Sequence, residues 1–385
     1  MFDSIHAAQT ILGRVEETSA SSEQLRRLDD RAVALIKQAG LARVFTPKRF
    51  GGYELAPRHH ILACATLARA CPAAAWVLMV CGAHTYVVGR YPQRAQEEVF
   101  ADDPDVLIAG TLAAQGKIEP VEGGWILDGR WQFGSGVDHS PWLLVGARPA
   151  DPNANYRAQH VVVPKTEIEI DDTWHTLGMR GTGSKDLVAR KVFVPSHRAM
   201  ETGPLFLGTF SGPAAPVYRL PVSAGLAAML SAAVVGMAER GIERFIDSTK
   251  ARTDVYYGGR KAARASIQRR IGEADTELSV ARLLIERMCD DFDVAMRENR
   301  PPMDIKIRAR IRRDAAYVVE LSRRALDRVF AASGAHAIYD YSMLQRAHRD
   351  IHTASHHQIV DFDAAAELFG GLTLDVEPAV PLAAI

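Results

Sequence analysis

The chain lacks an excess of charge of either sign. Its 385 residues contain 46 Lys and Arg against 46 Asp and Glu, so the formal net charge is zero. Proteins that bind nucleic acids or membrane surfaces generally need a basic excess, and we therefore expect neither partner. The hydrophobic content of 48% is ordinary for a globular protein. A chain of this length can bury the cores of two or three domains.

Cysteines and long apolar runs are also scarce. The chain has four cysteines: Cys64, Cys71, Cys81 and Cys289. None forms a close Cys-x-x-Cys pair, so free buried thiols in a reducing compartment are expected. Met1–Gly13 lacks the basic and then apolar pattern of a signal peptide. The most apolar window, Ala73–Val88, is too short to cross a bilayer comfortably. We expect a soluble, cytoplasmic protein.

A dinucleotide-binding glycine motif is missing. No Gly-x-Gly-x-x-Gly sequence follows an expected strand and opens a helix. The nearest Gly-rich stretch, Gly181–Lys185, lies between two β-like runs, which argues against a Rossmann or phosphate-loop site. A nucleotide cofactor would have to be held in another way.

What the sequence does contain is a change of pattern from helix to strand and back. Helical periodicity runs through Leu25–Ile36, with Gly40 as a stop, and through Arg58–Tyr91, with a break at Pro72. Short apolar or alternating runs between Val106 and Val194 are typical of an antiparallel β domain. Four long helical segments follow and predict a four-helix bundle: Pro221–Thr249, Ala262–Glu298, Ile305–Ala332 and Tyr341–Phe369. The prediction is a mainly α fold with a central β domain, divided into residues 1–103, 104–212 and 213–385.

Histidines cluster in the segment Arg349–His357. In a continuous helix, His352 and His356 would lie one turn apart on one face, which is one geometry of a metal site. A zinc site also needs a third ligand and usually a catalytic carboxylate, and the segment provides neither. We therefore expect no metal. The alternative is that these histidines cap or line a bundle helix.

Two other places contain reactive side chains. Trp131–His139 places Ser135 between glycines and aromatic residues. The glycines would let the backbone approach a planar ligand, and the hydroxyl could bind it; a simple β-turn explains the same glycines. His84 lies in an apolar helix, where a satisfied core histidine is the commoner explanation.

Four stretches, in this order and spacing, resemble the acyl-CoA dehydrogenase superfamily: Trp76–His84, Leu127–Gly136, Leu177–Ser184 and Arg346–His357. They are most similar to its flavin-dependent monooxygenase branch, which includes p-hydroxyphenylacetate hydroxylase oxygenase components, the secosteroid hydroxylase, nitrososynthases and the dibenzothiophene monooxygenase. The resemblance implies an N-terminal α domain, a β-barrel-like domain and a C-terminal four-helix bundle that assembles as a homotetramer. It places the flavin between the β domain and the bundle, with phosphate contacts from a neighbouring subunit.

The resemblance also implies roles for individual residues. Ser135 matches the serine near flavin N5, His357 the histidine beside the flavin, and His84 the histidine on the substrate side. The implied cofactor-binding residues are Phe133, Gly134, Ser135, Gly136, Arg252 and His357, and the implied substrate-binding residues are His84, Thr111 and Trp76. Two features depart from the family pattern. Gly110-Thr111 stands where phenol hydroxylases have a serine, and the spacing from Arg252 to Tyr257-Gly258 is unusual.

The function that the resemblance implies is that of an oxygenase component. It would accept reduced FMN or FAD from a separate flavin reductase and use O2, through a C4a-hydroperoxyflavin, to hydroxylate an aromatic or heteroaromatic small molecule. Ser135 and His357 would keep N5 protonated in a site that excludes water. His84 would orient the substrate or take a phenol proton.

Two alternatives remain at this point. An FAD-dependent acyl-CoA dehydrogenase or oxidase needs a carboxylate base. The family's late glutamate has no counterpart, because Thr353–His357 occupies that region, but Glu239 or Glu243 could serve. The other alternative is a non-catalytic binding subunit with a flavin fold, against which the presence of both Ser135 and His357 argues.

Overall fold

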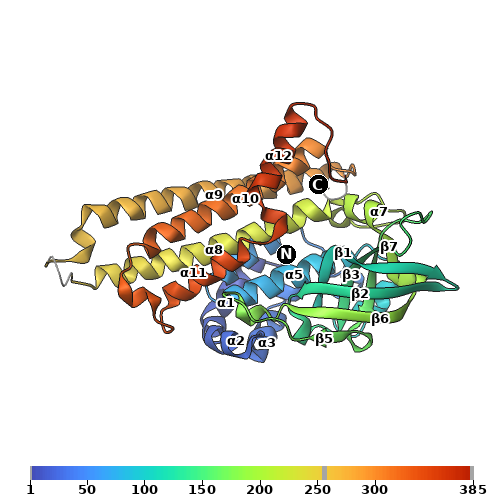
Figure 1. The fold of residues 1–385 in the computed structure, drawn as a ribbon, viewed down its shortest axis with the longest axis horizontal. Coiled ribbons are helices and arrows are strands. Elements are labelled where there is room, and N and C mark those ends of the chain that lie inside the picture. Colours follow the sequence, from blue (N-terminus) through green and yellow to red (C-terminus); the bar gives the residue numbers. More distant parts are fainter. Residues whose placement is uncertain (1, 254–257, 382–385) are drawn as a thin grey trace.

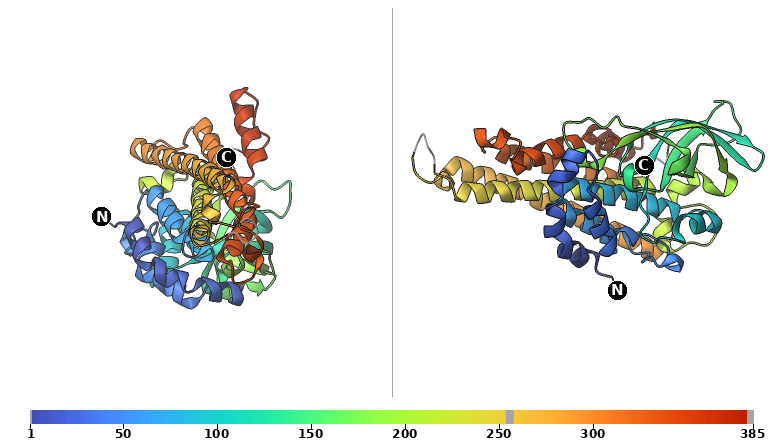
Figure 2. Two further views of the ribbon diagram at one scale, coloured as in Figure 1. Left: turned by 90° about the vertical axis from the view of Figure 1, so that its left-hand side faces the viewer. Right: turned by 90° about the horizontal axis from the view of Figure 1, so that it is seen from below.

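The computed structural model describes residues 2–253 and 258–381. The molecule is elongated, with a sheet at one end and a helical bundle that projects from the other (Figures 1 and 2). The N-terminal helices lie beside the bundle. They are α1 (Ser4–Glu16), α2 (Ser19–Leu25), α3 (Asp30–Gln38), α4 (Pro57–Ala68), α5 (Pro72–Val88) and α6 (Gln93–Phe100).

The N-terminal helices follow the local signals of the sequence, with one correction. Pro72 occupies the first turn of α5 and confirms the predicted break. The run from Leu25 to Ile36 is not one helix. Arg26 has φ +53°, which ends α2, and the Asp29 side chain accepts from the Arg31 backbone N–H to begin α3.

The central sheet has seven strands in the order β5-β6-β2-β1-β3-β4-β7. They are β1 (Ile108–Val121), β2 (Gly124–Gly134), β3 (Trp142–Pro149), β4 (Gln159–Pro164), β5 (Glu169–Asp171), β6 (Lys185–Pro195) and β7 (Ala199–Glu201). The prediction of an antiparallel domain is wrong for one pair, because β1 and β3 are parallel. The chain leaves β2 on one side of β1, crosses through residues 135–141 and returns on the other side as β3. This crossover carries Ser135.

The C-terminal half is a bundle of long helices. They are α8 (Val222–Lys250), α9 (Ala265–Glu298), α10 (Ile305–Phe330), α11 (Met343–Ala354) and α12 (Phe362–Thr373), preceded by the short α7 (Thr202–Leu207). The first three predicted segments are confirmed. The fourth is divided, because Asp361 accepts from the Ala364 N–H and begins α12 in a new direction (Figure 1).

Two hydrophobic cores organise the described residues. One joins the N-terminal helices to the bundle, and the other lies within the sheet around Trp131 and Leu187. The helix α8 is the one described helix long and apolar enough to span a membrane, and 89% of its apolar window is buried inside the protein. It is therefore a core helix. All four cysteines are free and buried, as predicted.

Candidate active site

Trp76 and Ser135 bring the first two sequence stretches together. Trp76 lies on α5, and its indole Nε1–H donates to Ser135 Oγ at 3.3 Å. Both residues are buried. Ser135 belongs to the crossover after β2, and the neighbouring Gly136 N–H donates to the Thr182 carbonyl at 2.9 Å. The structure therefore holds the Ser135 hydroxyl between a helix and the loop that precedes β6.

Ser135 continues into a short chain of hydroxyl groups. Its Oγ lies 2.7 Å from Ser184 Oγ, which lies 2.7 Å from Thr182 Oγ1. Thr182 Oγ1 in turn donates to the Met179 carbonyl at 2.8 Å. The stretches Leu127–Gly136 and Leu177–Ser184 thus contact each other through side chains as well as through the backbone.

The helix α11 anchors the same loop. The Asp350 carboxylate accepts from the Met179 N–H at 2.6 Å, and Arg349 Nη1 donates to the Leu177 carbonyl at 2.7 Å. Burial raises the pKa of Asp350 to about 6. A Cβ at Gly178 would lie 2.2 Å from the Arg349 carbonyl oxygen, so glycine allows this close approach. Arg349 and Asp350, in the stretch Arg346–His357, therefore hold the stretch Leu177–Ser184 in place.

His357 completes the group. It follows α11, and its ring centroid lies 6.1 Å from that of Trp76, edge to face. Its Nδ1 accepts from the Ile359 N–H at 3.2 Å, which leaves the proton of the neutral ring on Nε2. Protein atoms packed around the ring lower its pKa by desolvation, although the residue as a whole is exposed in the single chain. Of the three clustered histidines, His357 is the one beside Trp76.

His84 lies two turns along α5 from Trp76 and is buried. Its Nδ1 donates to the Ile108 carbonyl at 2.8 Å, and burial lowers its pKa to about 4. His84 is therefore neutral near pH 7, and its Nε2 is a hydrogen-bond acceptor.

Thr111 is less free than the sequence suggested. Its hydroxyl donates to the Gln132 carbonyl at 2.8 Å, so its proton is engaged within the sheet. Its neighbour Gly110 has φ +140°, and a Cβ there would lie 1.9 Å from the Leu144 carbonyl oxygen. A serine side chain therefore cannot occupy position 110 without moving β3.

The remaining cofactor candidates lie at two separate places. Phe133 and Gly134 end β2 beside Ser135; Phe133 is 59% exposed, has φ +71° and packs edge-on against Trp174. Arg252 follows α8 at the tip of the α8–α9 hairpin, which lies at the opposite end of the molecule from the sheet (Figure 1). Its Nη1 donates to the Ser333 carbonyl at 3.4 Å. Within one chain, Arg252 is not part of the Ser135 group. Tyr257 lies outside the described residues.

The continuous helix that would place His352 and His356 on one face does not form, because α11 ends at Ala354 before His356. His352 pairs with His348 instead. Their Nε2 atoms lie 2.8 Å and 3.2 Å, respectively, from Asp327 Oδ1 on α10. Three potential metal ligands thus lie within 4.8 Å of one another. They join two bundle helices, and Asp327 Oδ2 also accepts from Arg323.

The alternative glutamate bases are engaged in ion pairs. Glu239 pairs with Arg69 and Arg282, and Glu243 pairs with Arg69 and Arg240. These pairs hold α8 against its neighbours. They leave neither carboxylate available as a base beside Trp76 and Ser135.

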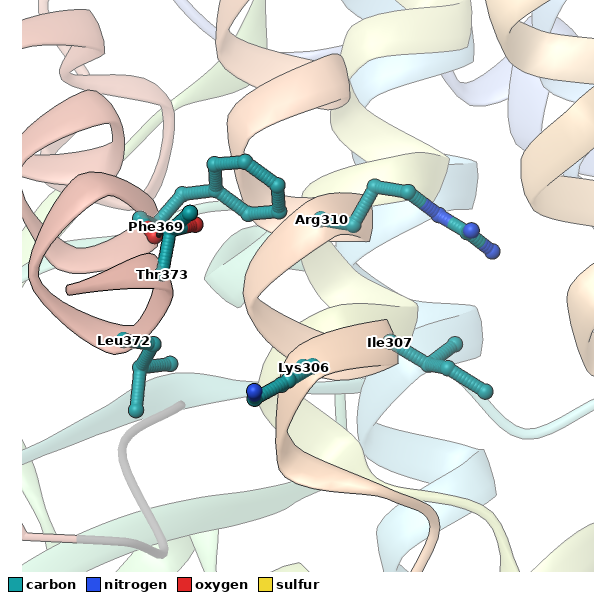
Figure 3. A pocket seen from close by; sticks show the side chains of 6 residues that line it. All are labelled: Lys306, Ile307, Arg310, Phe369, Leu372 and Thr373. Atoms are coloured by element: carbon teal, nitrogen blue, oxygen red, sulfur yellow. Dashed lines mark hydrogen bonds between the residues drawn. The ribbon is translucent and has the colours of Figure 1, made fainter. Parts of the chain in front are cut away.

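A separate hollow of about 290 Å³ lies between α10 and α12 (Figure 3). Figure 3 shows Phe369, Leu372 and Thr373 on α12 facing α10. The lining of the hollow also includes Lys306, Ile307 and Arg310. No residue of the four sequence stretches lines it, so this hollow is not part of the candidate site.

Three residues of the site received no role from the sequence: Thr182, Ser184 and Asp350. A signal for the first two was present, because hydroxyls at alternate positions before a strand point to the same side. Asp350 follows Arg349 in the matched stretch, but nothing in the sequence indicated that its carboxylate would accept from the Met179 N–H.

Comparison with known proteins identifies the same fold and similar sequences. Residues 228–362 match the family model described as acyl-CoA dehydrogenase, C-terminal domain. The chain is 32% identical to the oxygenase component of p-hydroxyphenylacetate 3-hydroxylase from Acinetobacter baumannii, over 96% of this chain and 88% of that protein. It is also 32% identical to the flavin-dependent monooxygenase oxygenase subunit HsaA of Mycobacterium tuberculosis, over 97% of this chain and 95% of that one.

Solved structures of related proteins show the same similarity. The HsaA monooxygenase from M. tuberculosis superimposes with a TM-score of 0.91 at 30% identity, covering 99% of both chains. XiaF from Streptomyces sp., solved in complex with FADH2 and glycerol, also gives a TM-score of 0.91, at 28% identity, and covers 98% of this chain and 96% of that one.

Proposed function

This chain belongs to the family of oxygenase components of two-component flavin-dependent monooxygenases, and from that premise we propose that it hydroxylates a phenolic or heteroaromatic small molecule. The reduced FMN or FAD comes from a separate reductase, and O2 is the second substrate. One observation carries the proposal: the four sequence stretches converge on Trp76, Ser135 and His357.

The donor and acceptor groups of the site fit a flavin. Ser135 is buried beside Trp76, and the neutral His357 ring has its proton on Nε2. A reduced isoalloxazine edge offers both an N–H donor and carbonyl acceptors, which these groups complement. Phe133, exposed at the end of β2, supplies an apolar surface beside Ser135. When bound, the reduced flavin supplies the electrons that activate O2.

The protein's own residues have distinct tasks in this proposal. Ser135 holds the flavin N5 edge, and His357 donates through Nε2 beside it. His84 is neutral because of burial, so its Nε2 accepts a phenolic O–H and increases the electron density of the ring. The buried indole of Trp76, two turns from His84 on α5, helps to exclude water from the reacting groups.

The bundle supports assembly into a homotetramer. The apolar side chains of Val280, Leu283 and Val294 are exposed on α9, where a neighbouring subunit would cover them. Arg252 is remote from Ser135 within one chain, and a neighbouring subunit would bring it to the flavin phosphate. The proposed units are residues 1–103, 104–212 and 213–385, and the proposed location is the cytoplasm.

The first test is whether reduced flavin alone supports hydroxylation. The purified chain is mixed with chemically reduced FMN or FAD, O2 and a panel of phenols and indoles. Product without any reductase or NAD(P)H supports the proposal and identifies the preferred flavin. Failure of every substrate, together with anaerobic bleaching of bound FAD by an acyl-CoA thioester, would instead identify a dehydrogenase.

A further inference from the structure

Three buried hydroxyl groups, those of Ser135, Ser184 and Thr182, form a chain whose hydrogen-bond direction is fixed. Their residues are 4%, 3% and 1% exposed, respectively. Polar groups this deeply buried must find partners within the protein. Each hydroxyl has one proton to donate and two lone pairs that accept. The partners at the two ends of the chain therefore determine where each proton points.

The Met179 carbonyl fixes one end. It can only accept, so Thr182 Oγ1, at 2.8 Å, donates its single proton to it. The same carbonyl also accepts from Trp174 Nε1 at 3.1 Å. Thr182 Oγ1 must then accept from Ser184, 2.7 Å away. Ser184 has thereby used its proton. Ser135 Oγ, 2.7 Å from Ser184 Oγ, must therefore donate to it.

Trp76 fixes the other end. The indole Nε1–H can only donate, so Ser135 Oγ accepts it at 3.3 Å. The Ser135 hydroxyl has then committed its proton to Ser184 and one lone pair to Trp76. What remains is a single lone pair. Toward any further ligand, Ser135 is an acceptor and not a donor.

We propose that this hydroxyl chain makes the site selective for reduced over oxidised flavin; the inference rests on the proposed function, which places Ser135 at flavin N5. Reduced flavin carries a hydrogen on N5 and can donate to the remaining lone pair of Ser135. Oxidised flavin has a lone pair at N5, which faces the lone pair of the serine and forms no bond. Ser184 and Thr182 are positioning residues, because they act only through Ser135.

Such selectivity suits an enzyme that takes its flavin from solution. Reduced flavin from a reductase must bind while oxidised flavin is also present. After turnover, oxidised flavin must leave before the next cycle. A fixed acceptor at N5 favours both steps without any movement of the protein.

The test measures binding and not turnover. Dissociation constants of oxidised FMN and of dithionite-reduced FMN are determined anaerobically for the wild type and for Thr182→Val. Valine has the shape of threonine but no hydroxyl, so the Ser184 proton can turn to Ser135 and the Ser135 proton can turn to oxidised N5. We expect the ratio of oxidised to reduced dissociation constants to fall about fivefold, the effect of one net hydrogen bond, mainly through tighter binding of oxidised FMN.

Two variants serve as controls. Thr182→Ser keeps the hydroxyl and should keep the wild-type ratio. Thr176→Val removes a hydroxyl that donates to the Gly178 carbonyl at 2.8 Å in the same loop but outside the chain, and it should also keep the ratio. If Thr182→Val does not fold, Ser184→Ala breaks the chain one link closer to Ser135 and should lower the ratio in the same way.

The outcomes separate this inference from the proposed function. An unchanged ratio in both Thr182→Val and Ser184→Ala, with tight binding of reduced FMN, would overturn the hydroxyl chain and leave the oxygenase proposal intact. Equal weakening of both flavin forms would indicate simple loosening of the loop and would also overturn it. A wild type that binds neither form of FMN or FAD contradicts the proposed function itself.

Discussion

At the scale of single residues, burial and hydrogen bonding set what each group of the candidate site can do. The Trp76 indole donates to Ser135, and its ring packs edge-on to His357. Ser135 and His357 therefore both lie beside the same side chain, although they are far apart in the sequence. The hydrogen bonds of each residue define whether it donates or accepts.

Ser135→Ala and His357→Ala should each uncouple oxygen use from hydroxylation. Loss of one net hydrogen bond to the flavin shifts the partition toward peroxide about fivefold, so a clearly larger share of the oxygen consumed should appear as H2O2. The measurement compares product and peroxide formed per O2 consumed. Ser140→Ala, which removes a nearby hydroxyl that donates to the Gly136 carbonyl, is the matched control and should stay coupled. Unchanged coupling in both site variants would refute these roles.

The pKa of His84 leads to a pH prediction. Because its pKa is lowered to about 4, the imidazole stays neutral on going from pH 8 down to about pH 5, whereas an ordinary histidine would take up a proton near pH 6.5. Hydroxylation of a phenol should therefore show no loss near pH 6.5 from this group and should fall only below about pH 5. His84→Asn should lower the rate about a hundredfold, and a wild-type loss centred near pH 6.5 that is absent in this variant would contradict the assignment.

At the scale of elements, the site depends on one loop held by one helix. Residues 177–184 carry Thr182 and Ser184, and α11 fixes them through Arg349 and Asp350. The same helix ends just before His357. The helix α11 therefore sets the distance between the two sides of the site.

Gly178→Ala should disturb this contact. Its Cβ would lie 2.2 Å from the Arg349 carbonyl oxygen, and overpacking of this kind costs about 1–3 kcal/mol of unfolding free energy. Thermal unfolding and the affinity for reduced flavin measure the effect, and both should decrease. Gly272→Ala on α9 is the control: a Cβ there meets nothing within 4 Å, so the helix should gain about 0.5–1 kcal/mol. Wild-type stability and affinity in Gly178→Ala would show that the helix does not hold the loop.

The order of elements was predictable from periodicity, and their ends were less so. The break at Pro72 is a covalent property of proline and could be read directly. The break before α12 could not, because the apolar pattern continues through it and the change of direction depends on the Asp361 cap. The parallel pairing of β1 and β3 also escaped prediction, since short alternating runs do not reveal which strands become neighbours.

The site itself was predictable only in part. Ser135 and His357 were identified by resemblance, and the structure places both beside Trp76. The one-turn spacing of His352 and His356, considered for a continuous helix, does not arise because α11 ends between them. The roles of Thr182 and Ser184 depend on contacts between segments about fifty residues apart, and no local pattern contains that information.

At the scale of the whole molecule, a single chain does not complete the proposed flavin site. In the proposed assembly, a neighbouring subunit completes it. Arg252 lies at the tip of the bundle, and α9, which runs back from that tip, carries exposed apolar side chains (Figure 1). Both observations favour a neighbour that covers the bundle and receives Arg252 at its site.

Arg252→Ala should weaken the binding of reduced FMN about tenfold, since a charge-assisted hydrogen bond to phosphate contributes roughly 1.5–3 kcal/mol. Light scattering should give the same tetrameric mass for variant and wild type. Riboflavin, which has no phosphate, should bind equally to both proteins. A variant that binds reduced FMN as tightly as the wild type would remove Arg252 from the site.

The central claim is that this chain transfers one atom of O2 to an aromatic substrate using reduced flavin from outside. Isotope labelling tests it most directly. The purified chain, chemically reduced flavin and the best phenol of the panel are mixed with 18O2, and the product is analysed by mass spectrometry. The account predicts a hydroxylated product that carries one 18O atom. A product with oxygen only from water, or oxidation of the flavin with all the oxygen released as peroxide for every substrate, would contradict it.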